Sequence, residues 1–194
     1  LFLSTTAGQS ISGGKGNDIY VIEASAVTVT ESLGEGTDWV MTMETSHTLG
    51  ANVENLIVIG GGAIYGTGND LNNIIVGGTG NDSITGGTGN DTLEGGAGLD
   101  TAIFSGNFFD SYQITATVGG TSAQEFQVVG LDGTDTLSNF EYLKFTGSGI
   151  VYSVGTLNTA TLTGTATDDI LIGGSSVTSI VGDTGDDYLI ASQG

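Results

Sequence analysis

Three aspartates at nine-residue intervals, Asp82, Asp91 and Asp100, have the clearest chemical potential in this chain. Each closes a glycine-rich hexapeptide, because the stretch from Gly77 to Ile103 reads GGTGNDSIT, GGTGNDTLE and GGAGLDTAI without a gap. In each nonapeptide Gly occupies positions 1, 2 and 4, Asp occupies position 6, and an apolar residue occupies position 8. Carboxylates and backbone carbonyls at this spacing offer oxygen ligands, which hard cations such as Ca²⁺ prefer. The spacing therefore predicts a repeated set of oxygen atoms that could hold a hard cation.

The elements that must position these aspartates follow from the same spacing. Positions 1 to 6 are too rich in Gly for a helix or a strand interior, so we expect turns that adopt positive φ and aim carbonyls at one point. Positions 7 to 9 predict a short strand, with the position 8 side chain (Ile84, Leu93 or Ala102) pointing inward. One nonapeptide is then half a coil, so residues eighteen apart stack directly, Asp82 against Asp100 and Asn73 against Asp91.

Such stacking brings acidic side chains close to one another. Two bare carboxylates about 4.8 Å apart, the spacing of strands, repel by roughly 3 to 4 kcal/mol at an effective dielectric of about 20. No Lys or Arg lies within the three repeats to offset this repulsion. A divalent cation would offset it, and Ca²⁺ accepts six or more oxygens in loose geometry. The alternative interpretation is an acidic Gly-rich loop without metal. Three tandem copies of the repeat support this alternative much less than a single copy would.

The pattern resembles the RTX family of hemolysin-type calcium-binding repeats, found in bacterial proteins exported by type I secretion. The resemblance implies an all-β, right-handed parallel β-roll with calcium between successive coils at each edge. It also implies that carbonyls at positions 2 and 4 of one turn, carbonyls at positions 1 and 3 one coil later, and both position 6 side chains hold each ion. One implied ligand set is Gly78, Gly80, Asp82, Gly95, Ala97 and Asp100. A second is Asn69, Leu71, Asn73, Gly86, Thr88 and Asp91.

Two further ion positions are implied where the repeat is less regular. GGKGNDIYV (13–21) and LGEGTDWVM (33–41) place two aspartates twenty residues apart, and the implied set is Gly14, Gly16, Asp18, Leu33, Glu35 and Asp38. A second array starts at residue 164 and reads GTATDDILI, GGSSVTSIV and GDTGDDYLI. Its implied set is Thr165, Thr167, Asp169, Gly182, Thr184 and Asp187. The middle repeat of this array has Thr178 in place of Asp, so we expect no metal there.

The remaining segments predict the organisation of the chain. TLGANVENLIVIG (48–60) resembles an insertion without calcium, in which Asn52 and Asn55 bond turn backbone, with strands at 55–59 and 63–65. Residues 11–104 then form one solenoid. Strands predicted at 111–118, 124–129, 140–145 and 150–154 are separated by turn signals at Gly119–Gly120 and Asp132–Gly133. This segment resembles the antiparallel cap of secreted metalloproteases of the family; there Asp132 and Asp135 are either ligands or turn residues. We expect three parts: a β-roll at 1–104, an antiparallel cap at 105–160, and a second partial β-roll at 161–194.

Composition limits the partners. The chain has 194 residues, 22 acidic and two basic ones, and a formal charge of −20. Nucleic acid is excluded because nothing neutralises phosphate, and anionic membrane surfaces are poor partners. No apolar run approaches the ~20 residues of a membrane span, so we expect no membrane insertion.

Apolar residues at 170, 172, 188 and 190 share one outer face, which either the cap covers or a partner binds. There is no Cys, as suits a chain that is exported unfolded.

The sequence gives little support for a catalytic site in this chain. The single His, His47, argues against a serine triad or a His-rich zinc site, and its spacing of three from Glu44 fits chance. We therefore expect a non-catalytic module that folds on meeting extracellular Ca²⁺. Because the chain starts without Met and stops inside a repeat, we expect a larger secreted or surface-attached bacterial parent of the adhesin or surface-layer type. The alternative is an accessory or secretion module of a secreted protease, lipase or polysaccharide-modifying enzyme.

Overall fold

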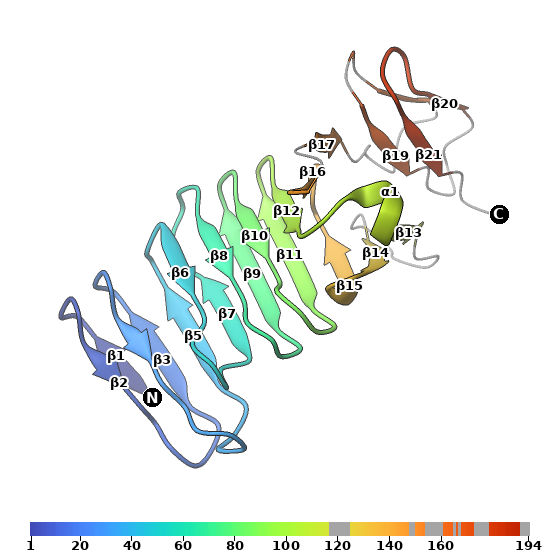
Figure 1. Ribbon diagram of the computed structural model, residues 1–194. Coiled ribbons are helices and arrows are strands. Elements are labelled where there is room, and N and C mark those ends of the chain that lie inside the picture. The colour runs from blue at the N-terminus through green and yellow to red at the C-terminus, as the bar shows by residue number, and fades with distance from the viewer. Residues whose placement is uncertain are drawn as a thin grey trace.

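The computed structural model is a stack of flattened coils in which short strands run parallel to one another (Figure 1). It describes residues 1–116, 125–147, 150–153, 161–164, 166, 168–172 and 179–190. Within these residues the fold is all-β apart from a single helical turn, α1 (Phe108–Ser111). In the described part of the chain no helix has the length and apolar character that a membrane crossing requires.

Two sheets form the long faces of the solenoid. The larger sheet has nine strands, in the order β1 (Phe2–Ser4), β3 (Ile19–Ile22), β5 (Trp39–Thr42), β7 (Asn55–Val58), β9 (Ile74–Thr79), β11 (Thr92–Ala97), β15 (Gly133–Ser138), β14 (Glu125–Gly130) and β13 (Gln113–Ala116). The opposite sheet has six, in the order β6 (Ser46–Thr48), β8 (Tyr65–Thr67), β10 (Ser83–Thr85), β12 (Thr101–Phe104), β16 (Tyr142–Phe145) and β17 (Ile150–Ser153). A short pair, β2 (Ser10–Ile11) and β4 (Thr28–Val29), lies beside the N-terminal coils.

The parallel register confirms the eighteen-residue coil predicted for the central repeats. Leu93 pairs with Ile75 on β9, and Ile84 pairs with Ala102 on β12. All four side chains are fully buried, as expected for the inward position 8. Alternation of one buried and one outward residue follows from the two-residue period of a strand, and it places the aspartates just before each strand, at the edge of the solenoid.

The insertion at residues 48–60 keeps the stack continuous without the repeat. Asn52 Nδ2 donates to the carbonyl of Glu31 at 2.9 Å, and Asn55 Nδ2 donates to the carbonyl of Asp38 at 3.0 Å. Both amides therefore bond backbone of the preceding coil, which confirms their predicted role. The first predicted strand of this insertion corresponds to β7.

The strand predicted at 63–65 instead lies at 65–67, as β8. The reason is that the inward residue is Gly66, which has no side chain, whereas Ile64 is buried one step earlier, in the turn. Ile64 occupies the place that Asp82 has in the next coil, since Tyr65 pairs with Ser83. Prediction from the apolar pattern alone therefore placed this strand two residues too early.

The cap is only partly antiparallel. Strands β13 and β14 pair antiparallel, as do β14 and β15, and β16 and β17. However, β15 adds parallel to β11 and β16 adds parallel to β12, so one strand of the cap extends each sheet. The turn predicted at Asp132–Gly133 joins β14 to β15, but strand β15 and helix α1 were not predicted. The predicted turn at Gly119–Gly120 lies outside the described residues.

The second array forms two short parallel pairs, β18 (Thr161–Thr163) with β20 (Ser179–Val181), and β19 (Ile170–Ile172) with β21 (Tyr188–Ile190). The Tyr188 ring meets the Phe108 ring of α1 edge to face at 5.0 Å between centroids, and Ile190 packs against the main core. The predicted outer face therefore contacts α1 at Tyr188, although Tyr188 remains 37% exposed. Leu189, at an inward position of the repeat, is 48% exposed.

Candidate metal centre

The turns of the repeats have the backbone conformations that the glycine spacing predicted. Gly78 and Gly80, at positions 2 and 4, have φ of +103° and +151°, a region that side chains with a Cβ rarely adopt. These conformations aim carbonyls toward the neighbouring coil: a Cβ added at Gly96 would lie 2.1 Å from the Gly78 carbonyl oxygen, and one added at Gly98 would lie 1.6 Å from that of Gly80. The predicted carbonyl ligands at positions 2 and 4 therefore face the next turn.

One oxygen of each repeat aspartate bonds the backbone of the preceding coil. Asp100 Oδ1 accepts the N–H of Asp82 at 2.8 Å, and Asp91 Oδ1 accepts the N–H of Asn73 at 2.8 Å. The same contact recurs at the other predicted edges, where Asp38 accepts from Asp18 and Asp187 accepts from Asp169. The predicted stacking of these carboxylates one coil apart is therefore present in the structure.

The second carboxylate oxygen has no such bond. Oδ2 is buried without a hydrogen-bond partner in each of the following residues: Asp18, Asp38, Asp82, Asp91 and Asp100. An anionic oxygen taken out of water without a partner is strongly destabilising. Either a proton or a cation must therefore accompany these groups in the folded state.

The pKa values of the buried carboxyls express this cost. Burial raises the pKa of Asp91 to about 6, and burial together with the charges of Asp82 and Glu141 raises that of Asp100 to about 6. Burial also raises the pKa of Asp82 and of Asp38. In each case burial makes ionisation of the carboxyl group less favourable, and a bound cation would offset this cost.

A cradle of oxygen atoms lies over the glycine at position 1 of three turns, Gly68, Gly77 and Gly164. A Cβ added at Gly77 would lie 2.6 Å from Asp82 Oδ2 and 2.6 Å from the carbonyl oxygen of Gly95, one coil later. The same pair of oxygens converges over Gly68 and over Gly164, the equivalent residues of the other edges. A carboxylate or amide oxygen and a carbonyl oxygen thus meet where the absence of a side chain leaves room. This all-oxygen donor set fits Ca²⁺, which takes carboxylate and carbonyl oxygens in flexible geometry.

The other predicted ligands are placed as follows. The carbonyls of Ala97 and Glu35, at position 3, accept the N–H of Gly80 and Gly16 respectively, and each keeps a second lone pair. The carbonyls of Asn69 and Leu71 face the glycines of the next coil, Gly87 and Gly89. Thr165 and Thr167 lie outside the described residues. Among the described residues no three His, Cys, Asp or Glu side chains group as a metal site, so two position 6 side chains and backbone carbonyls would carry each site.

Three carboxylates continue the same ladder of contacts: Glu54 and Glu141, which sequence reasoning missed, and Asp135, which it gave as either a ligand or a turn residue. Glu54 accepts the N–H of Asp38 at 2.7 Å, Glu141 accepts that of Asp100 at 2.7 Å, and Asp135 accepts that of Asp91 at 2.8 Å. Glu54 and Glu141 carry no repeat signature that could have identified them. Asp135 does, because G-L-D-G-T-D at 130–135 has Gly at positions 1 and 4 and Asp at position 6.

The N-terminal edge also differs from the central ones. Glu31 accepts the N–H groups of Gly13 and Gly14 and the Tyr20 hydroxyl. Hydrogen bonds from these three donors outweigh burial and lower the pKa of Glu31. A carboxylate of the chain itself therefore occupies this turn, close to the predicted Asp18–Asp38 site.

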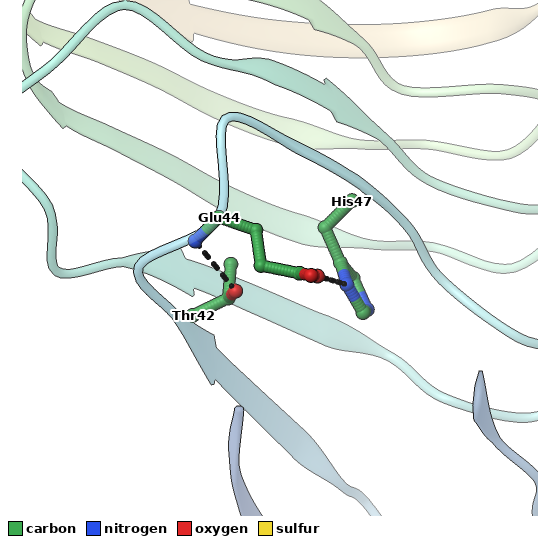
Figure 2. A network of polar contacts seen from close by, with 3 residues as sticks. All are labelled: Thr42, Glu44 and His47. Carbon is green, nitrogen blue, oxygen red and sulfur yellow. Dashed lines mark hydrogen bonds and ion pairs between the residues drawn. The ribbon is translucent and has the colours of Figure 1, made fainter. Parts of the chain in front are cut away.

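The histidine forms a local contact with a carboxylate three residues earlier. His47 Nδ1 lies 3.3 Å from Glu44 Oε2, and the Glu44 N–H donates to Thr42 Oγ1 at 3.0 Å (Figure 2). His47 occupies an inward position of β6 and is buried. The contact fastens the turn between β5 and β6.

Comparison with known proteins agrees with this geometry. Four copies of the RTX calcium-binding nonapeptide repeat match the chain, over residues 67–102 and 154–189. A curated relative, the endo-1,3-1,4-beta-glycanase ExsH of Rhizobium meliloti (strain 1021), is 47% identical over 68 residues. That match spans 35% of this chain and 14% of the relative's length. The glycine-lined oxygen cradles and the matched repeats identify these segments as calcium-binding repeats of the RTX family.

Proposed function

We propose that this chain is a non-catalytic calcium-binding module whose folding is driven by extracellular Ca²⁺, within a larger secreted or surface-attached bacterial protein of the adhesin or surface-layer type. The carrying observation is the set of buried aspartate Oδ2 atoms without partners at the edges of the coils. The proposed ligand sets are those of the four edges given above. We also propose that the chain divides into a β-roll (1–104), a cap (105–160) and a second array (161–194), as the repeat pattern of the sequence predicts.

The mechanism is coupled folding and binding. Ca²⁺ binds the stacked turns and not the open chain, so each site stabilises the fold by about 2.7 kcal/mol when free Ca²⁺ is a hundred times its Kd. Low calcium inside the cell keeps the chain unfolded for export, and high calcium outside folds it. The contribution of the protein's own residues is to hold oxygens in place and to exclude water from the two position 6 side chains of each edge.

Far-UV circular dichroism of the purified chain tests this proposal. The spectrum in EGTA should show a largely unfolded chain, and millimolar Ca²⁺ should restore the β signal, whereas Mg²⁺ at the same concentration should not. Mg²⁺ demands near-ideal octahedral geometry and gives up water reluctantly. The same β content in EGTA and in Ca²⁺ would overturn the proposal.

The alternative is an accessory or secretion module of a secreted enzyme. The glycanase relative favours it, since a part of that protein resembles 35% of this chain. On this alternative catalysis resides in another domain, and the chain alone has no hydrolytic activity. A pull-down of the chain with insoluble mixed-linkage β-glucan, in Ca²⁺ and in EGTA, separates the two proposals. Calcium-dependent retention on the glucan favours the enzyme module, and calcium-dependent self-association in sedimentation favours the adhesin type.

A further inference from the structure

Residues 130–138 form one more half-coil of the solenoid, although they lie outside the matched repeats and far along the chain. Strand β15 pairs parallel with β11, with Thr136 opposite Thr92 and Leu137 opposite Leu93. Leu137 is fully buried at the inward position. Gly133, at position 4 of this stretch, has φ of +137°, as the position 4 glycines of the repeats do. The cap therefore returns to the nine-residue register after leaving it at residue 104.

The turn of this coil makes the contacts of a repeat turn. Asp91 donates its N–H to Asp135 Oδ1 at 2.8 Å, across 44 residues of sequence, as Asp82 does to Asp100 across 18. Gly89 donates its N–H to the Asp132 carbonyl at 2.7 Å, as Gly80 does to the Ala97 carbonyl. A Cβ added at Gly133 would lie 1.7 Å from the Gly89 carbonyl oxygen, so that carbonyl points into this turn.

In the described part of the chain, the two carboxylates that face each other here form no ion pair with a basic side chain. Asp91 and Asp135 are 1% and 2% exposed, and Asp91 Oδ2 has no hydrogen-bond partner. The neighbouring Asp132 side chain is not available to them, because it accepts bonds from the N–H and hydroxyl of Ser105 and from the Tyr112 hydroxyl. Two buried carboxylates and inward-pointing carbonyls again form an oxygen donor set for a hard dication.

We propose that Ca²⁺ binds between the half-coil at 86–94 and the half-coil at 130–138, held by the carboxylates of Asp91 and Asp135 and the carbonyls of Gly89 and Asp132. This inference rests on the proposed function of the repeats and extends it to a site formed by segments that are not adjacent in sequence. Its consequence is that one ion fastens the cap to the β-roll, so the cap cannot dock fully before calcium binds.

Ion counting by native mass spectrometry, with affinities from calorimetry, tests the site on the full chain. Asp135→Asn keeps an oxygen for the Asp91 N–H but removes the charge, so it should weaken one ion at least tenfold and leave the others unchanged. Asp91→Asn should weaken two ions, because Asp91 also faces Asn73. The matched control is Glu23→Gln, which removes the same charge from an exposed carboxylate outside every proposed ligand set and should weaken none.

The outcomes separate this inference from the proposed function. A wild-type chain that binds no calcium overturns the proposed function, whereas an Asp135→Asn variant with the wild-type ion count and affinities overturns the junction site alone. Hydrogen exchange of the wild-type chain gives a second readout that needs no variant to fold. Calcium should slow exchange in the peptide covering 125–138 along with that covering 77–103. Slowing of 77–103 without any effect on 125–138 would also overturn the junction site.

Discussion

Replacing Gly77 by Ala should abolish calcium binding at one edge and leave the backbone otherwise unstrained. Gly77 is not among the glycines with positive φ, so Ala fits its backbone conformation. The added Cβ, however, would lie 2.6 Å from both Asp82 Oδ2 and the Gly95 carbonyl oxygen. Contacts this short cannot persist, and the backbone carbonyl has little freedom to move. The two oxygens that converge on the proposed ion must therefore separate.

The expected loss has a part that depends on calcium and a part that does not. Overpacking a closed site costs about 1–3 kcal/mol, and the lower entropy of the unfolded chain returns about 0.4–1 kcal/mol. Without calcium the variant should therefore lose about 1–2 kcal/mol. In calcium at a hundred times Kd it also forfeits the ion, worth about 2.7 kcal/mol, which brings the loss to about 3–5 kcal/mol.

Urea unfolding followed by circular dichroism, in EGTA and in excess Ca²⁺, measures both parts. Should the chain be unfolded in EGTA, a series of calcium concentrations gives the same information from the slope of stability against the logarithm of concentration. The matched control is Gly62→Ala, where an added Cβ meets nothing within 4 Å. It should be neutral or slightly stabilising under both conditions. If Gly77→Ala lost the same stability with and without calcium, the oxygen cradle would not be an ion site.

Three further predictions concern the pH dependence of stability, the packing of the core, and the contact between the second array and α1. Without calcium, the folded fraction should fall as pH rises from about 4 to about 6, because the pKa values of Asp91 and Asp100 are raised to about 6 and the folded state then binds more protons than the unfolded one. Far-UV circular dichroism of the chain freed of calcium by dialysis, between pH 4 and 8, measures this, and a β signal that grows as pH rises would contradict it. Leu93→Ala should cost about 2–5 kcal/mol, since Leu93 is fully buried on β11; urea unfolding in Ca²⁺ measures the loss, and a cost below 1 kcal/mol would contradict the inward assignment. Tyr188→Ala should speed hydrogen exchange in β21 by removing its ring contact with Phe108, a type of contact worth about 0.5–1.5 kcal/mol; Leu131→Ala, at an exposed site, is the control, and unchanged exchange in β21 would show that the contact does not hold the second array.

The local features of the fold were predictable because they recur every nine residues. Positive φ at positions 2 and 4, an inward apolar residue at position 8 and an edge aspartate at position 6 are each properties of one turn and one short strand. Stacking then follows from coil length alone, and the register of Ile75 with Leu93 and of Asp82 with Asp100 confirms it. The apolar pattern was misleading at Ile64, because there a buried side chain takes the place of the aspartate in the turn and Gly66 takes the place of the apolar residue in the strand.

The sequence by itself determined which residues form turns, which point inward and which carboxylates stack eighteen residues apart. Only the tertiary structure decided how the solenoid ends: that β15 and β16 add to its two open edges, that Asp135 and Glu141 continue the ladders of Asp91 and Asp100, and that Tyr188 packs on Phe108. The physical reason is that periodicity encodes contacts between segments one coil apart. Pairing across 41 or 44 residues instead depends on which strand edge remains open and which apolar surface remains uncovered once the coils have stacked.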